Sequence, residues 1–328
     1  MSHRAITEQV SLFPADDGGY EDAPSTSELE RMKRVLEQSG RYVVLRRLHP
    51  SDTYLEAAPE AAGSLRRGVY LDVETTGLNA NDKIIELALV SFEYDDAGSV
   101  YRVLERFDEF EDPGSPIPRE ITDLTGITSA DVRGKRIQDE RVNALVGSAD
   151  LVIAHNAAFD RPFVERRLPV FESLDWACSV SDVDWHRFGF RGRKLEYLAM
   201  ERGFVYESHR AISDCEAGLE ILALPLSGQQ PPPLANLLSN ANRTSVRLWA
   251  VGSPFDSKDL LKSRSYRWNA GAKTWWRDVA SDEHEAELEW LLANVYGRPM
   301  RLPYHPITAT LRYSTRIPDA PPPGAPTL

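Results

Sequence analysis

Cysteine is scarce in this chain, which has only Cys178 and Cys215 among its 328 residues. Two cysteines are too few for a disulfide framework or for a zinc site built from cysteines, and such usage is typical of a reducing compartment. No run approaches the ~18 consecutive apolar residues of a membrane span. The polar first residues predict no signal peptide. We therefore expect a globular protein of the cytoplasm that does not enter a membrane.

Basic residues are also in deficit, since 50 Asp and Glu against 38 Lys and Arg give a net charge of -12. Global acidity argues against a broad, non-specific binder of duplex nucleic acid. The charge is unevenly distributed, because residues 243–277 contain eight basic and two acidic residues, for a net charge of +6. The remaining -18 is compatible with a small acidic pocket that binds divalent metal.

Apolar runs in the first two thirds of the chain predict one main domain. Strands are expected at 42–46, 69–71, 84–94, 101–110 and 151–154, and helices at 158–167, 195–201 and 211–224. Three consecutive strands followed by alternating helices and strands predict a mixed α/β sheet with helices on its faces.

Composition sets the expected boundaries of the other parts. The division we predict is a disordered lead and N-terminal helix at 1–40, the main domain at 41–226, a proline-rich linker at 227–241, a small basic and aromatic domain at 242–316, and a disordered tail at 317–328.

Two acids stand at the end of the first long strand of the main domain. Asp72 and Glu74 are two residues apart, so both side chains leave the same face of the strand. Acids at buried strand positions are costly unless a cation compensates them. The turn Thr75-Thr76-Gly77 follows and offers backbone N–H groups to a phosphate. Taken alone, the pair fits an exposed acidic turn at the end of a strand better than a metal site.

Three further residues occupy suitable places. Asp160 follows the strand at 151–154 in the first turn of a helix, at the sheet edge where open α/β folds bind ligands. Asp214 is expected near the start of the next long helix, with His209 on the segment before it. A histidine on such a segment is suited to deprotonate a water. In isolation, Asp160 fits a helix cap and His209 an ordinary surface histidine.

The order of these residues carries more weight than any one of them. Asp72-Val-Glu-Thr-Thr-Gly-Leu78, Ile85-Glu-Leu-Ala88, Leu124-Thr-Gly-Ile-Thr128, His155-Asn-Ala-Ala-Phe-Asp160 and His209-Arg-Ala-Ile-Ser-Asp214 follow one another along the chain. In this order they strongly resemble the DEDDh 3′–5′ exonucleases, which include the proofreading subunit of bacterial replicative polymerase, ribonuclease T and oligoribonuclease. The resemblance covers about residues 68 to 224 and implies a ribonuclease H-like sheet.

The resemblance also implies the chemistry of the site. Asp72, Glu74, Asp160 and Asp214 would hold two divalent metal ions, and His209 would take the proton from the attacking water. Oxygen ligands favour Mg²⁺ or Mn²⁺ over Zn²⁺. The terminal nucleotide would be bound by the segment Thr75, Thr76, Gly77 and Leu78. Phe159 beside it could stack a base, but core packing is the better default for this residue. The product would be a nucleoside 5′-monophosphate.

The C-terminal domain interleaves cations with aromatic rings, as surfaces that bind single-stranded nucleic acid do. The candidate contacts are Lys262, Arg264, Arg267, Trp268, Lys273 and Trp275. Burial of the tryptophans in a small core and a protein-docking platform are the alternatives.

Three functions remain open from the sequence. The first is a 3′–5′ exonuclease on single-stranded DNA, or short RNA, in repair or proofreading. The second is a polymerase- or repair-associated subunit whose nuclease activity depends on its partner. The third, a nuclease fold that only binds nucleic acid, is opposed by the complete set of acids. The sequence predicts no oligomeric state.

Overall fold

The computed structural model describes residues 24–55, 65–225 and 230–322, and the expected disorder of residues 1–23 and 323–328 lies outside these ranges. Disorder is also expected at 317–322, but this part is wrong, because the carbonyl oxygens of Pro318 and Asp319 accept hydrogen bonds from Arg247 and Asn269. The chain divides into two compact units, Met1–Leu45 and Arg46–Leu328. No helix in the described ranges is long and apolar enough to cross a membrane.

The first unit contains helix α1 (Thr26–Gln38), which begins where the sequence predicts a helix start. Ser25 and Glu28 form a capping box: the Ser25 side chain accepts from the Glu28 N–H, and the Glu28 carboxylate accepts from the Ser25 N–H at 2.8 Å. No residue of α1 is buried, and its apolar side chains, Leu29 and Val35 among them, are exposed.

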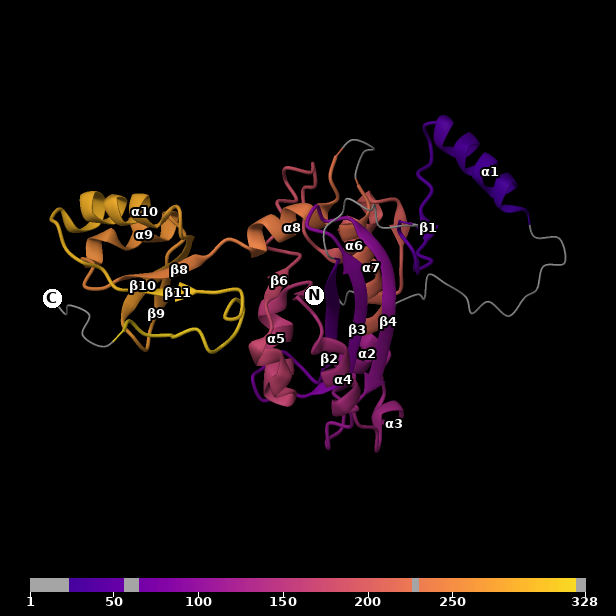
Figure 1. Cartoon of the computed structure of the whole chain (residues 1–328), viewed down its shortest axis with the longest axis horizontal. Helices are drawn as coiled ribbons and strands as arrows, with labels where there is room; N and C mark the ends of the chain where they lie inside the picture. The colour runs from indigo at the N-terminus through magenta and orange to yellow at the C-terminus, as the bar shows by residue number, and fades with distance from the viewer. Residues whose placement is uncertain (1–23, 56–64, 226–229, 323–328) are drawn as a thin grey trace, which may run out of the picture. The chain divides into compact units, whose positions relative to one another are not determined.

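A five-stranded sheet of order β4-β3-β2-β5-β6 is the centre of the second unit (Figure 1). Its strands are β2 (Arg66–Thr75), β3 (Ile84–Tyr94), β4 (Val100–Phe110), β5 (Leu151–Ala154) and β6 (Trp176–Cys178). β2, β3 and β4 pair antiparallel, whereas β5 and β6 add parallel to β2. The predicted mixed α/β sheet is therefore confirmed.

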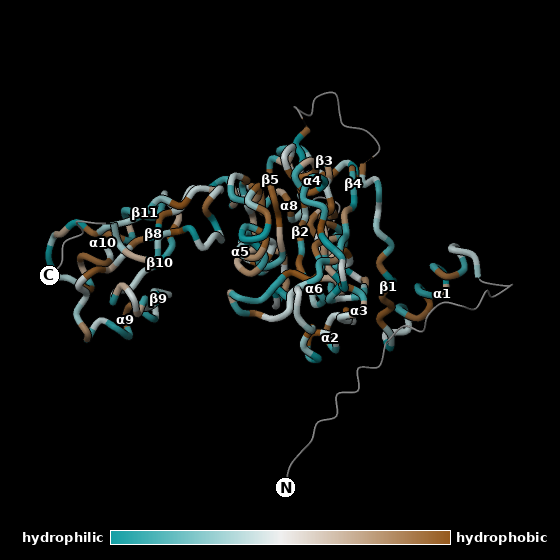
Figure 2. Tube along the Cα trace, turned by 90° about the horizontal axis from the view of Figure 1, so that it is seen from below, coloured by the Kyte–Doolittle hydropathy of each residue, from teal (hydrophilic) through white to brown (hydrophobic). Residues whose placement is uncertain are grey.

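Helices cover both faces of this sheet because its central strands, β2, β3 and β5, are largely buried on both sides. The α-helices of the second unit that precede residue 242 are α2 (Arg119–Thr125), α3 (Ser129–Val132), α4 (Asp139–Val146), α5 (Ala157–Arg167), α6 (Leu195–Glu201), α7 (Ala211–Ala223) and α8 (Pro233–Ala241). One face packs with α6, α7 and α8, and the other with α4 and α5. Figure 2 shows apolar residues concentrated along the central strands.

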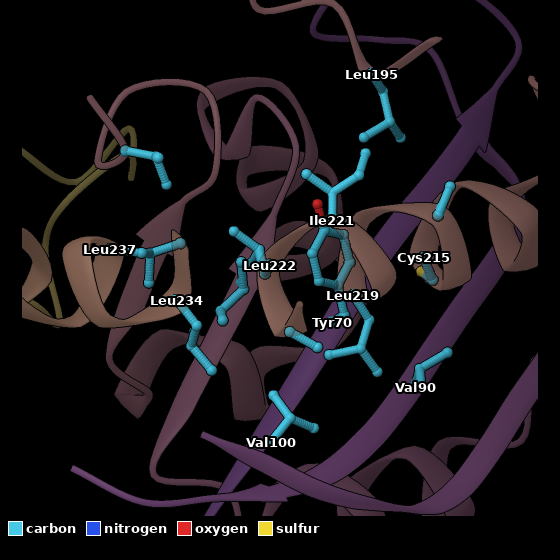
Figure 3. Close-up of a cluster of buried hydrophobic side chains, with 14 of the residues drawn as sticks. Tyr70, Val90, Val100, Leu195, Cys215, Leu219, Ile221, Leu222, Leu234 and Leu237 are labelled. Atoms are coloured by element: carbon cyan, nitrogen blue, oxygen red, sulfur yellow. The ribbon is translucent and has the colours of Figure 1, made fainter. Parts of the chain in front are cut away.

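Close packing between α7 and the sheet depends on a glycine. A Cβ on Gly218 of α7 would lie 2.1 Å from the hydroxyl oxygen of Tyr70 on β2, so only glycine allows this approach. Tyr70 and Cys215 lie in this apolar cluster (Figure 3). The contact fixes α7, and with it Asp214, against the strand that carries Asp72 and Glu74.

The expected strand at 42–46 is wrong, because only β1 (Arg46–Arg47) pairs, with β7 (Phe204–Val205). The expected linker at 227–241 is helical from Pro233 onward. Leu234, Leu237 and Leu238 of α8 are buried in the cluster of α6 and α7. Proline is well tolerated in the first turn of a helix, so the proline run marks the beginning of α8 as well as a boundary between segments.

The C-terminal part contains a four-stranded antiparallel sheet of order β11-β8-β10-β9. Its elements are β8 (Ser245–Ala250), α9 (Lys258–Ser263), β9 (Arg267–Asn269), β10 (Thr274–Ala280), α10 (His284–Leu291) and β11 (Tyr304–Ile307). The short helical turns of the second unit are η1 (Pro169–Ser173), η2 (Phe255–Ser257) and the π-helical η3 (Leu292–Tyr296).

Residues 308–316, here called the return segment, follow β11 and bind α5 and β6. The N–H of Trp176 donates to the carbonyl oxygen of Ala309 at 3.1 Å, and the buried Arg161 donates to the carbonyl oxygens of Thr310 and Arg312. The end of the C-terminal part is therefore attached to the five-stranded sheet.

Candidate active site

Three of the predicted acids meet where β2 ends. Asp72 and Glu74 leave the same face of β2 as Tyr70, which is the face that α7 covers. Asp214 lies in the first turn of α7. One carboxylate oxygen from each of Asp72, Glu74 and Asp214 lies within 4.8 Å of the other two. The prediction that these residues converge is confirmed.

Asp160 comes to the same end of the sheet from the other side. Because β5 runs parallel to β2, with Ala154 beside Leu71, the helix that follows it begins near Asp72. Asp160 is in the first turn of this helix, α5, and is 2% exposed. Its Oδ2 atom is buried and has no hydrogen-bond partner. Asp160 is not a member of the three-residue group, but its charge contributes to the raised pKa of Asp72.

Burial among like charges raises the pKa values of these acids. Desolvation is the largest cause throughout, and repulsion from the other carboxylates adds to it. The pKa of Asp72 is raised well above its usual value, and those of Glu74 and Asp160 are raised to about 8. The pKa of Asp214 is raised to about 7. A divalent cation would remove this repulsion and supply the partner that Oδ2 of Asp160 lacks, so these residues fit a metal site.

The predicted base, His209, lies just before α7, as the sequence indicates. It has φ +64°, in the left-handed region, which places it on a bend rather than on the helix. Its side chain is 40% exposed, and its Nε2 atom is 3.7 Å from Oε1 of Glu196. The His209 side chain is therefore accessible to solvent and lies beside Glu196.

Two neighbours of Asp214 were not identified from the sequence. The Tyr206 hydroxyl donates to Oδ1 of Asp214 at 2.8 Å, and the N–H of Arg210 donates to Oδ2 at 3.2 Å. The hydrogen bond from Tyr206 lowers the pKa of Asp214 against the effect of burial. Nothing in the spacing of Tyr206 indicated this contact, because Tyr206 lies outside the matched motifs.

Glu86 holds the bend that carries His209. It is fully buried on β3, directly opposite Glu74 in the strand register. Its carboxylate accepts from the guanidinium of Arg210 at 2.8 Å and from the N–H of Ala211 at 2.9 Å. Glu86 belongs to the matched segment Ile85-Glu-Leu-Ala88, so the sequence held a signal for it without indicating its role.

In the segment after β2, the Thr76 N–H and the Thr75 hydroxyl already have partners within the protein. The N–H of Thr76 donates to the carbonyl oxygen of Lys83 at 2.8 Å, and the Thr75 hydroxyl donates to that of Gly77 at 2.7 Å. The expectation that the Thr76 N–H is free for a phosphate is therefore wrong. Gly77 is needed here, because a Cβ would lie 2.7 Å from the carboxylate of Asp82.

A pocket of about 520 Å³ lies beside this segment and α5. Two predicted nucleotide contacts line it, Leu78, which is 81% exposed, and the partly buried Phe159. The Phe159 ring also packs on Phe163, with ring centroids 5.1 Å apart. Phe159 therefore combines the two roles that its sequence position left open, core packing and exposure to a pocket.

Residues 69–222 match the family model RNase_T, described as exonuclease. This stretch contains every motif on which the resemblance rests. This domain belongs to the DEDDh exonucleases.

Curated relatives match the exonuclease domain and extend far beyond it. A PolC-type DNA polymerase III of Clostridium perfringens is 35% identical over 162 residues, covering 47% of this chain and 11% of its own length. The PolC-type DNA polymerase III of Streptococcus suis is 30% identical over 201 residues, covering 56% and 13%. This chain thus spans about a tenth of the length of these relatives.

Solved exonuclease structures are also similar to the chain. Exonuclease X in complex with 5′ overhanging duplex DNA is 24% identical, with a TM-score of 0.39, over 52% of this chain and 99% of that one. Exonuclease I of E. coli in complex with single-stranded DNA, in its zinc-bound form, is 16% identical, with a TM-score of 0.41, over 56% and 48%.

The candidate contacts outside the exonuclease domain divide into two groups. Lys262, Arg267 and Lys273 are exposed, and Trp268 is 51% exposed. Trp275, by contrast, is 8% exposed in the core beneath α9 and α10, and Arg264 pairs with the buried Glu287 at 2.9 Å. The structure therefore does not bring all six to one free surface, and for Trp275 the core interpretation is the better one.

Proposed function

We propose that this chain is a metal-dependent 3′–5′ exonuclease that releases nucleoside 5′-monophosphates from the 3′ end of single-stranded DNA or short RNA. The observation that carries the proposal is the meeting of Asp72, Glu74 and Asp214 within 4.8 Å in a DEDDh exonuclease domain. Carboxylates with raised pKa values gathered at one site are typical of a functional centre.

The four acids would hold two divalent cations. Mg²⁺ and Mn²⁺ suit a donor set made only of carboxylate oxygens. When bound, such ions neutralise charge on the phosphate and lower the pKa of water. Raised pKa values mean that the acids must lose protons before they bind a cation, so binding couples to proton release.

The remaining residues would accept a proton, position another residue of the site or contact the substrate. His209 would accept the proton of the attacking water, and its exposure lets it pass that proton to solvent. Tyr206 would orient Asp214 through their 2.8 Å hydrogen bond. Glu86 would fix the bend at Arg210, so that His209 stays beside the acids. Leu78 and Phe159 would contact the terminal nucleotide.

DNA is the favoured substrate because the curated relatives are DNA polymerases by name. We accordingly propose a role in DNA repair or proofreading. The same relatives support a second candidate, a nuclease that depends on a polymerase partner, because their matching domain occurs within a much longer polymerase chain. Accessory contact to the strand would come from the exposed group of Lys262, Arg267, Trp268 and Lys273.

The test is digestion of 5′-labelled single-stranded DNA and RNA of one sequence, with Mg²⁺, Mn²⁺ or EDTA. The proposal predicts metal-dependent shortening from the 3′ end, abolished in Asp214→Asn. Asp123→Asn is the matched control, since Asp123 is exposed on α2, where it pairs only with Arg119 at 3.5 Å. Cleavage only after a polymerase is added would favour the partner-dependent candidate, and no cleavage in either setting would refute both.

A further inference from the structure

The pocket beside the active site is built partly by the far end of the chain. The segment after β2 contributes Leu78, and α5 contributes Phe159 and Arg166. The third wall comes from Thr315 and Arg316 of the return segment, which lies far beyond α5 in the sequence. At about 520 Å³ the pocket has the size of a small-molecule or nucleotide site.

The return segment is a fixed wall, because buried side chains hold it. Arg161 is fully buried and binds two of its carbonyl groups, those of Thr310 and Arg312. Glu165, 7% exposed, accepts from the Ser314 hydroxyl at 2.6 Å and from Arg316 at 3.0 Å. These contacts come from consecutive turns of α5, the helix whose first turn contains Asp160.

Two arginines supply positive charge at the pocket. Arg166 is exposed, and its guanidinium donates to the carbonyl oxygens of Ala80 and Asp82 at 2.6 and 2.8 Å. Among the described residues it forms no ion pair shorter than 4 Å, although its charge is near enough to contribute, after the hydrogen bonds of Asp82, to the lowered pKa of that carboxyl. Arg316 shares Glu165 with Arg161, which leaves one net positive charge in this group of three.

The other walls are apolar or negative. The exposed Leu78 and the ring of Phe159 offer a surface on which a flat base can pack. Arg166 itself lies over the Phe163 ring, 4.9 Å from its centroid, which orients the guanidinium. Glu172 is the exposed carboxylate that lines the pocket, and an anionic ligand would be repelled by it.

We propose that this pocket binds one nucleotide of the single-stranded substrate, with its backbone phosphate on Arg166 and Arg316 and its base against Leu78 and Phe159. The return segment is thus part of the substrate site. This inference rests on the proposed function, because it assigns further contacts to the same substrate. Guanidinium groups suit phosphate because they present several donors in one plane.

The experiment measures binding of a fluorescein-labelled oligothymidylate to the full-length chain by anisotropy, in EDTA to prevent cleavage, over a range of salt concentrations. Arg166→Ala and Arg316→Ala should each weaken binding about 5- to 10-fold and reduce the slope of log K against log salt by about 0.7. Arg316→Lys should keep the slope. Glu172→Gln should strengthen binding about 2-fold by removing the repulsive charge.

Arg119→Ala is the matched control, because this arginine has a side chain 91% exposed on α2 and should leave binding unchanged. Arg316→Ala should fold, since Glu165 keeps Arg161 and Ser314 as partners, and thermal unfolding checks this. Weaker binding with an unchanged salt slope would mean a purely structural role and would overturn the proposal.

Cleavage assays on the same variants separate this inference from the proposed function. If the wild type cleaves and both alanine variants bind and cleave as it does, the pocket proposal is wrong and the exonuclease stands. If the wild type binds without cleaving under any metal, the exonuclease proposal fails, and the salt slopes still decide the pocket. If the wild type does not bind the strand at all, the pocket proposal is refuted.

Discussion

Neutralising one acid of the cluster should stabilise the metal-free protein. At an effective dielectric constant of about 20, two unit charges at the 4.8 Å limit repel by about 3.5 kcal/mol. Asp72→Asn removes the repulsion of Asp72 from both Glu74 and Asp214 while keeping the shape of the side chain. Because raised pKa values leave the acids partly protonated at pH 8, we expect a smaller gain of about 1–3 kcal/mol in the free energy of unfolding.

The assay is thermal unfolding at pH 8, in EDTA and in excess Mg²⁺. The gain corresponds to a melting temperature about 2–10 °C higher for Asp72→Asn than for the wild type in EDTA. In Mg²⁺ the order should reverse, because the wild type gains binding free energy that the variant loses. Asp123→Asn controls for a charge change outside the cluster. If Asp72→Asn is destabilised equally in both solutions, the acids do not repel one another and the electrostatic account is wrong.

Three further predictions follow from particular contacts. The pKa of Glu74 is raised to about 8 in the folded state, so the unfolded chain binds fewer protons than the folded one above pH 4.5. The free energy of unfolding of the metal-free protein should therefore fall as the pH rises from about 4.5 to about 8. A melting temperature that rises over this range would contradict the prediction. Tyr206→Phe removes a hydrogen bond to Asp214 and should shift the pH profile of cleavage upward by about one unit, whereas an unchanged profile would show that Tyr206 does not tune Asp214. Leu237→Ala on the buried face of α8 should lower the free energy of unfolding, measured by urea titration, by about 2–5 kcal/mol. The control Leu260→Ala removes a part-exposed side chain and should change this free energy little.

Sequence patterns predicted the centre of the sheet well because strands such as β3 and β5 are apolar on both faces. The strand at Ile84–Tyr94 and the helix at Leu195–Glu201 have the expected bounds. The strand expected at 42–46 was wrong, since a short apolar run forms a strand only where a partner strand is available. Here β7 pairs with Arg46 and Arg47 alone. The proline run concealed α8, whose burial depends on the distant residues of α6 and α7.

The acids of the site were predictable because local motifs place them on a strand end and on two helix starts. Tyr206 and Arg166 were not, since each acts through a partner that only the fold brings near, Asp214 for one and the loop carbonyls for the other. Trp275 is the opposite case, because the sequence suggested a contact to nucleic acid and the fold places this ring in the core. A basic and aromatic composition indicates binding, but it does not reveal which rings the core uses.

The most direct test of the central claim is the identity of the first product released in ¹⁸O-labelled water. A single-stranded oligonucleotide with a unique 3′-terminal nucleotide would be digested with Mg²⁺ under single-turnover conditions and analysed by mass spectrometry. The account predicts that this nucleotide leaves as a 5′-monophosphate that carries ¹⁸O in its phosphate, and that EDTA or Asp214→Asn prevents its release. A first product from the 5′ end or the interior, or release that persists in EDTA, would contradict the account.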